Sequence, residues 1–245
     1  MFSPSSPQSE FALRRLHDLA ADLASIYNTN KDLAIAYMDK YTQECSTHQA
    51  QIGLSQDVLG NECVARVHKT LLSHSIKSWR LIHVESDYYS WPLQKRAFRL
   101  NCPSIQHLCK TIIFENTKYR PRTGIDELDP RYSQYYCVVV QYTTKLDNTK
   151  LNNFVRGLLD PRLPSGHYNL RLTSEEQCLQ LTGFLNGGVS PIGLLKSNVP
   201  VIVSSEMTLL QPKLAVIGGG HVDWKLVIGI DELMVITKCM TADLI

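Results

Sequence analysis

The pattern of hydrophobic and polar positions changes along the chain near residue 76. Before that point apolar residues recur every three or four positions, which predicts helices at about 10–27, 31–50 and 61–74. From Trp79 onward apolar and polar residues alternate over short stretches, which predicts strands at about 79–85, 108–114, 136–142, 199–203, 214–217 and 224–228. We therefore expect an α+β domain at 76–245, preceded by a helical extension at 1–75 with a disordered Ser- and Pro-rich tip at 1–7.

Two further helices are expected between these strands, at 147–158 and 173–181. The second begins with a capping box, in which Thr173 pairs with Glu176. These short helices separate several of the strands within the expected α+β domain.

Composition limits the class of protein. The chain has 245 residues, of which 44% are hydrophobic and 20% charged, as in an ordinary globular protein. No apolar run approaches the roughly 18 to 20 residues that span a bilayer, so we expect no membrane association. Seven cysteines lie far apart without a CxxC, which favours a reducing, cytoplasmic setting. The net charge of +2 does not by itself indicate a nucleic-acid partner.

The segment Thr182–Gly193 is rich in glycine and also contains apolar residues. Glycine reaches positive φ and allows another molecule to approach the main chain, and Pro191 fixes the direction in which the segment ends. The interleaved Phe184, Val189 and Ile192 indicate a packed loop with a defined shape. The segment is therefore either a ligand-binding loop or a tight structural turn.

Lys110 lies within an apolar strand pattern, Leu108 to Phe114. Because both faces of that strand are largely apolar, a buried ammonium there needs an anionic or carbonyl partner. The alternative is that Lys110 lies at the entrance of the strand and extends to water. The segment Lys118–Arg122, which interleaves an aromatic with cations, suits a phosphate backbone or else forms a solvated loop.

The sequence comes close to one catalytic motif and one cofactor-binding motif without matching either. Gly188 to Gly193 resembles the G-x-S-x-G nucleophile elbow, but its second glycine comes one residue late and Pro191 lacks the amide that the elbow needs after Ser190. The run after Val216 is not a dinucleotide fingerprint, since a strand pattern follows it where a helix is required, so an oxidoreductase is disfavoured. It predicts a hairpin, whose His221 and Asp223 either line a site or cap the turn. No histidine or cysteine spacing predicts a metal site, and no cofactor is expected.

Several of these segments, taken in order, resemble the YbaK and prolyl-tRNA synthetase editing-domain superfamily of aminoacyl-tRNA deacylases. The similar segments are 109–114 (CKTIIF), 145–151 (KLDNTKL), 181–193 (LTGFLNGGVSPIG), 199–203 (VPVIV) and 216–223 (VIGGGHVD). The resemblance covers about 79–245 and implies a mixed, partly barrel-like β-sheet flanked by helices. The helical extension at 1–75 has no counterpart in compact family members.

The resemblance implies that the protein hydrolyses the ester of a mischarged aminoacyl-tRNA, with alanine or cysteine on the tRNA for proline as substrates. It assigns catalytic roles to Lys110, Gly187, Gly188, Ser190 and Pro191, with Ser190 as a supporting hydroxyl. It assigns substrate binding to Tyr88, Trp91, Gly183, Val189, Gly218, Gly219, His221 and Asp223.

The expected partners are aminoacyl-tRNA and, through the N-terminal helices, an aminoacyl-tRNA synthetase, a multi-synthetase complex or a second copy of the chain. A different class of function stays open: a non-catalytic module that binds tRNA or a synthetase. Release of an amino acid from charged tRNA distinguishes the two.

Overall fold

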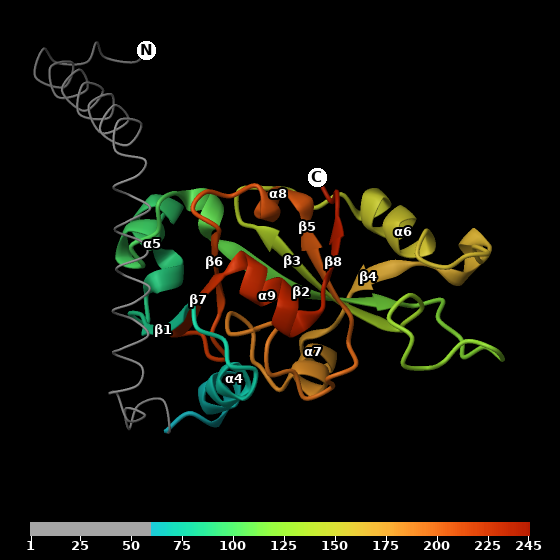
Figure 1. Ribbon diagram of the computed structural model, residues 1–245, viewed down its shortest axis with the longest axis horizontal. Coiled ribbons are helices and arrows are strands. Elements are labelled where there is room, and N and C mark those ends of the chain that lie inside the picture. The colour runs from blue at the N-terminus through green and yellow to red at the C-terminus, as the bar shows by residue number, and fades with distance from the viewer. Residues whose placement is uncertain (1–59) are drawn as a thin grey trace, which may run out of the picture. The chain divides into compact units, whose positions relative to one another are not determined.

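A computed structural model describes residues 60–245 of the chain (Figure 1). The helices expected at 10–27 and 31–50, and the expected disordered tip, lie outside the described residues. The α-helices of the described part are α4 (Glu62–Ser73), α5 (Leu93–Arg99), α6 (Asn148–Arg156), α7 (Glu175–Thr182), α8 (Ser205–Thr208) and α9 (Ile230–Thr237). Short 3-10 helices are η1 (Tyr88–Ser90), η2 (Ile105–His107) and η3 (Ser165–His167). Within residues 60–245 no helix has the length and apolar character needed to cross a bilayer.

The strands of the described part form two sheets. They are β1 (Trp79–His83), β2 (Cys109–Asn116), β3 (Tyr135–Gln141), β4 (Leu170–Leu172), β5 (Val201–Ser204), β6 (Leu214–Gly218), β7 (Trp224–Gly229) and β8 (Met240–Ala242). One sheet is antiparallel with the order β1-β7-β6, and the other is mixed with the order β4-β2-β3-β5-β8. The sheets meet where Leu108, directly before β2, bridges Val216 of β6. This arrangement confirms the α+β class with flanking helices.

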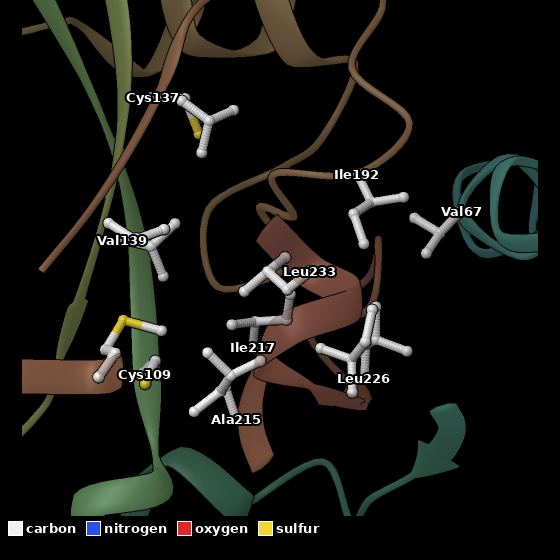
Figure 2. Packing of buried hydrophobic residues seen from close by; sticks show 14 of the residues in the cluster. Val67, Cys109, Cys137, Val139, Ile192, Ala215, Ile217, Leu226 and Leu233 are labelled. Carbon is white, nitrogen blue, oxygen red and sulfur yellow. The ribbon is translucent and has the colours of Figure 1, made fainter. Parts of the chain in front are cut away.

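The main core fills the space between the two sheets and the helices that cover them. Figure 2 shows Cys109, Cys137 and Val139 of β2 and β3 on one side, with Ala215, Ile217, Leu226 and Leu233 of β6, β7 and α9 on the other. Because both faces of β3 are apolar and buried, this strand is central, and a second cluster packs on its other face against α6.

Helix α4 is part of the same compact unit as the sheets. Its Val64, Val67 and Leu71, spaced three and four residues apart, are completely buried. The side chain of Asn61 caps the helix by accepting from the backbone N–H groups of residues 63 and 64. Val67 packs against Ile192 of the glycine-rich segment (Figure 2). A domain start at residue 76 would leave this packed helix out of the domain whose core it completes.

The predicted capping box at the start of α7 is wrong. The N-cap is Ser174, whose hydroxyl accepts from the backbone N–H of Gln177 at 3.1 Å. Thr173 instead donates both its backbone N–H and its hydroxyl to the carbonyl of Ile113 in β2. These two bonds hold Thr173 to the neighbouring strand, so the helix begins at Glu175.

Candidate functional site

A cavity of about 390 Å³ lies at the junction of the two sheets. Its volume is within the range of small-ligand sites, about 300 to 1,000 Å³. The first half of β2 forms one wall, and the glycine loop, which we define as Thr182–Gly193, faces it together with β6 and β7. The residues that line it are Tyr88, Tyr89, Leu108–Ile113, Tyr142, Leu172–Glu175, Cys178, Phe184, Asn186, Gly187, Val189, Val216–Gly218 and Lys225.

The cavity collects some of the residues predicted from sequence and leaves out others. Its lining includes Lys110, Gly187, Val189, Gly218 and Tyr88. Outside the lining lie Gly183, Gly188, Ser190, Pro191, Trp91, Gly219, His221 and Asp223. The geometry of each group shows why.

Lys110 lies on β2 and is half-buried in the cavity wall. Its Nζ is 5.9 Å from the centre of the Tyr142 ring, and no carboxylate of the described residues forms an ion pair with it. A cation–π contact of this length compensates little of the cost of removing an ammonium from water. The charge of Lys110 is therefore available to an anionic or carbonyl ligand in the cavity.

A second lysine, Lys225 of β7, also lines the cavity and is only 3% exposed. Its Nζ donates to the carbonyl of Val222 at 2.6 Å and lies 4.5 Å from the centre of the Tyr89 ring. Burial lowers the pKa of Lys225 from 10.5 to about 8, against the opposing effect of the Asp223 carboxylate. We did not single out Lys225 from the sequence, although it stands in an apolar strand pattern as Lys110 does.

The tyrosines of η1 connect this lysine to the glycine loop. The hydroxyl of Tyr89 donates to the carbonyl of Gly187 at 2.7 Å, and burial raises the pKa of Tyr89 well above its ordinary value. Arg96 of α5 donates to the carbonyls of Trp91 and Tyr89, which fixes the backbone of η1. Tyr89 is therefore a neutral hydrogen-bond donor at neutral pH.

Trp91 follows η1 but is engaged elsewhere. Its Nε1 donates to the Asp87 carboxylate at 2.9 Å, and Lys95 lies 3.6 Å from the centre of its ring. These contacts hold the indole beside η1, where it packs on the Tyr88 ring at 5.8 Å without lining the cavity.

Two glycines allow the loop and the β6–β7 hairpin to close on each other. A Cβ on Gly218 would lie 2.1 Å from the carbonyl oxygen of Val189, and one on Gly188 would lie 2.7 Å from the Cα of His221. Any larger residue at either position would separate the two segments. The backbone N–H groups of Gly187 and Gly188 are already used, by the Asn186 side chain and the Leu185 carbonyl.

The ends of the glycine loop are held by α4. Gly183 and Gly193 have φ of 71° and 76°, which favour glycine. Arg66 of α4 donates to the carbonyls of Gly193 at 2.7 Å, Thr182 at 3.0 Å and Gly183 at 3.2 Å. Its guanidinium also lies over the Phe184 ring, 4.6 Å from its centre. Arg66 thus binds both ends of the loop, and Gly183 belongs to this anchor.

Ser190 and Pro191 are buried inside the loop. The Ser190 hydroxyl accepts from the backbone N–H of Ile192 at 3.2 Å, so it stabilises the turn. This position suits a supporting hydroxyl and is unsuited to attack on a ligand.

The tip of the β6–β7 hairpin bonds mainly within itself. His221 Nδ1 accepts from the backbone N–H of Asp223 at 3.2 Å and lies 3.7 Å from its carboxylate. The backbone N–H of Gly219 donates to the Trp224 carbonyl at 3.0 Å. The carbonyl of Asp223 accepts from Val84, which joins the tip to the end of β1. These bonds cap the turn, the alternative that the sequence left open.

The profile of the aminoacyl-tRNA editing domain matches residues 97–235, which include the cavity wall, the glycine loop and the hairpin. The chain belongs to the aminoacyl-tRNA editing domain family.

Solved structures share the fold of this editing domain. The crystal structure of "a putative trans-editing enzyme for prolyl tRNA synthetase" is 20% identical, with a TM-score of 0.57, over 75% of this chain and 97% of that chain. A structure from work on epitope grafting onto scaffold proteins is 17% identical, with a TM-score of 0.57, over 75% and 97%. A hypothetical protein is 20% identical, with a TM-score of 0.53, over 73% and 98%. No curated protein sequence matches the chain significantly.

The editing-domain cavity contains few groups suited to act as a nucleophile. Cys109 and Cys178 line it, but burial raises the pKa of both thiols and keeps them protonated. Within residues 60–245 no cluster of three or more His, Cys, Asp or Glu is arranged to hold a metal ion. Thr111, beside Lys110, also lines the cavity, and its hydroxyl is buried without a hydrogen-bond partner.

Proposed function

We propose that the protein is a trans-editing aminoacyl-tRNA deacylase that hydrolyses alanine or cysteine from the tRNA for proline. One observation carries this proposal beyond family membership: the ammonium of Lys110, without a carboxylate partner among the described residues, lies on the wall of a cavity that the glycine loop closes. A cation in a cavity of this size suits a small ligand that is anionic or becomes so during reaction.

The reaction is the hydrolysis of an ester between an amino acid and the ribose of the terminal adenosine. The oxygen of a water molecule bonds to the acyl carbon, the bond from that carbon to the ribose oxygen breaks, and the proton that the water loses goes to the ribose oxygen. Negative charge develops on the acyl oxygen in the transition state. In this proposal Lys110 stabilises that charge or binds the neighbouring phosphate.

Stabilisation by the loop amides is limited by the bonds they already make. Since the N–H groups of Gly187 and Gly188 are used within the loop and Lys225 already donates to the Val222 carbonyl, the ammonium of Lys110 is the stronger donor to a ligand in this cavity. The loop then contributes shape more than charge, by keeping its wall at a fixed distance from β2.

Selectivity arises from the apolar part of the cavity wall. Cys109, Ile113, Phe184 and Ile217 line it, and none offers a strong polar contact to an amino-acid side chain. Such a wall accepts a small apolar or thiol side chain. A synthetase distinguishes side chains that differ by one methylene by only about 1 to 3 kcal/mol, which is why a second, hydrolytic site is useful.

The decisive experiment measures amino acid released by micromolar purified protein from tRNA for proline charged with alanine, cysteine, serine or proline. We expect release of alanine or cysteine and sparing of proline. Lys110→Ala should lower kcat/KM at least 100-fold, as loss of one transition-state donor does. Lys238→Ala, which removes an exposed lysine outside the cavity, is the matched control. Absence of release from every charged tRNA, with Lys110→Ala changing only tRNA binding, would favour the non-catalytic binding module.

A further inference from the structure

A second cavity, of about 280 Å³, lies beside α6 and η3. It is lined by Asn148, Thr149, Asn152, Asn153, Arg156, Ser165 and Tyr168. Every one of these side chains can donate a hydrogen bond, one carries a positive charge, and none is a carboxylate. The lining therefore suits an anionic ligand with several acceptor oxygens.

Two of the side chains that line this cavity each have a polar atom that is buried without a hydrogen-bond partner. These atoms are Nε of Arg156 and the hydroxyl of Tyr168, and Tyr168 is only 8% exposed. Arg156 also forms no ion pair with any described residue. Buried polar atoms in folded proteins are normally hydrogen-bonded, so two unpartnered donors on side chains that line one cavity point to a ligand.

The cavity is preformed because α6 is fixed to β4. The side chain of Asn152 accepts from the backbone N–H of Leu170 at 3.0 Å, and the side chain of Asn148 donates to its carbonyl at 3.3 Å. These bonds saturate the backbone of Leu170 and hold the two asparagines in place. Arg156, one turn beyond Asn152, is thereby held beside Tyr168.

The basic segment Lys118–Arg122 lies next to this cavity. Arg122 bonds to the ring of His167 in η3 at 3.3 Å. The Tyr119 ring packs on Tyr132 with centres 5.0 Å apart, and Tyr132 packs on Tyr168 at 5.8 Å. These contacts bring a second cation, Arg122, to the end of the cavity that holds Tyr168 and Arg156, as a ligand with more than one negative charge requires.

The two cavities are joined by an extended stretch of chain. Tyr168 lines the second and Leu172, at the end of β4, lines the first. Four residues of extended chain span about 13 Å. A free amino acid or phosphate is too small to contact both cavities, whereas an RNA strand carries phosphates along such a span.

We infer that the second cavity binds a backbone phosphate of the tRNA whose aminoacyl end occupies the first cavity. This inference rests on the proposed function for the identity of the RNA. Arg156 supplies charge-assisted donors to the phosphate oxygens, and the Tyr168 hydroxyl supplies a further one.

The binding test measures the Kd of uncharged tRNA by fluorescence anisotropy. Arg156→Gln should weaken binding about tenfold and lower the slope of log Kd against log salt by about 1, and Tyr168→Phe should weaken it about threefold. Arg99→Gln, which removes an exposed arginine paired with Glu85, is the matched control for net charge and should change Kd less than twofold. Since neither Arg156 Nε nor the Tyr168 hydroxyl has a partner to lose, both variants should keep the melting temperature of the wild type. Arg156→Lys, which keeps the charge, should retain most of the affinity.

The deacylation test separates this inference from the proposed function. Arg156→Gln should raise KM for charged tRNA about tenfold with kcat unchanged, and leave hydrolysis of aminoacylated adenosine, which reaches only the first cavity, unaffected. If no substrate is hydrolysed but Arg156→Gln still weakens tRNA binding, the proposed function fails and the second site stands. Equal weakening of tRNA binding by Arg156→Gln and Arg99→Gln overturns the inference. It is also overturned if Arg156→Gln abolishes binding of inorganic phosphate without changing the Kd of tRNA, because the cavity then serves free phosphate.

Discussion

The buried ammonium of Lys225 predicts an unusual dependence of stability on pH. In the folded protein its pKa is about 8, while in the unfolded chain it returns to the ordinary value of 10.5. Below pH 8 both states hold the proton, and the folded state bears the cost of burying the charge. Between pH 8 and 10.5 the folded protein loses the proton while the unfolded chain keeps it, so the free energy of unfolding contributed by this group rises with pH.

The size of the effect follows from the lowering of the pKa. The lowering of the Lys225 pKa corresponds to roughly 3 kcal/mol in the free energy of unfolding. About 2.5 kcal/mol of this change appears between pH 7 and pH 10. Lys225→Met keeps an unbranched apolar side chain and removes the charge. At pH 7 the variant avoids the cost of burying a charge but loses the hydrogen bond to the Val222 carbonyl. Each effect is worth about 1 to 3 kcal/mol, so wild type and variant should have similar free energies of unfolding. At pH 10 the wild type should be more stable by about 2.5 kcal/mol.

The assay is urea unfolding followed by tryptophan fluorescence at intervals from pH 7 to pH 10, with wild type and variant compared at each pH. Other groups titrate equally in both proteins, so their contributions cancel in the difference. Lys69→Met, which removes an exposed lysine without a side-chain contact to a tryptophan, measures the effect of net charge alone. A constant difference between wild type and Lys225→Met across this range would show that Lys225 keeps its proton in the folded state, and would refute the reasoning.

Three substitutions test how the cavity wall is held together. Gly218→Ala should destabilise the protein by more than about 3 kcal/mol because its Cβ would overlap a carbonyl of the glycine loop, whereas Gly166→Ala, with open space around it, should change stability by less than about 1 kcal/mol in thermal unfolding. Arg66→Met should lower stability by about 2 to 3 kcal/mol by leaving carbonyls at both ends of the loop without their donor, and the exposed Lys69→Met on the same helix should be neutral. Tyr89→Phe should cost about 1 kcal/mol in urea unfolding; no loss would mean that its bond to the loop contributes nothing.

Much of the fold is predictable because its strands carry strong local patterns. β2, β3 and β7 are runs of apolar residues bounded by polar ones, and α4 shows both its cap and its apolar spacing. β4 and β8, with three residues each, are too short for alternation to show. The sequence did not predict α9. This helix follows β7 directly and continues its apolar run, so no change in the hydrophobic period marks where it begins.

The site is also predictable only where the local sequence carries a signal. Lys110 and the glycine loop are visible because each is unusual within its own segment. Lys225 and Tyr89 join them only through the pairing of β6 with β7 and the packing of η1, contacts between residues far apart in the chain. His221 is a polar residue beside the cavity glycines in sequence, yet its ring bonds within the hairpin tip. Proximity in sequence to the cavity residues therefore predicts more polar residues in the cavity lining than the structure contains.

The glycines have a different physical role from the one their pattern suggests. A glycine-rich loop predicts close approach of a ligand to the main chain, but most of these glycines allow one part of the chain to approach another. Gly188 and Gly218 bring the loop and the hairpin into backbone contact, and Gly193 and Gly220 face α4. A cavity wall held by such contacts cannot move unless the glycine loop, the hairpin and α4, which are packed on each other, separate. The cavity can therefore discriminate between ligands by size, and under the proposed function the positive charge comes from Lys110 on β2, the strand that the wall faces.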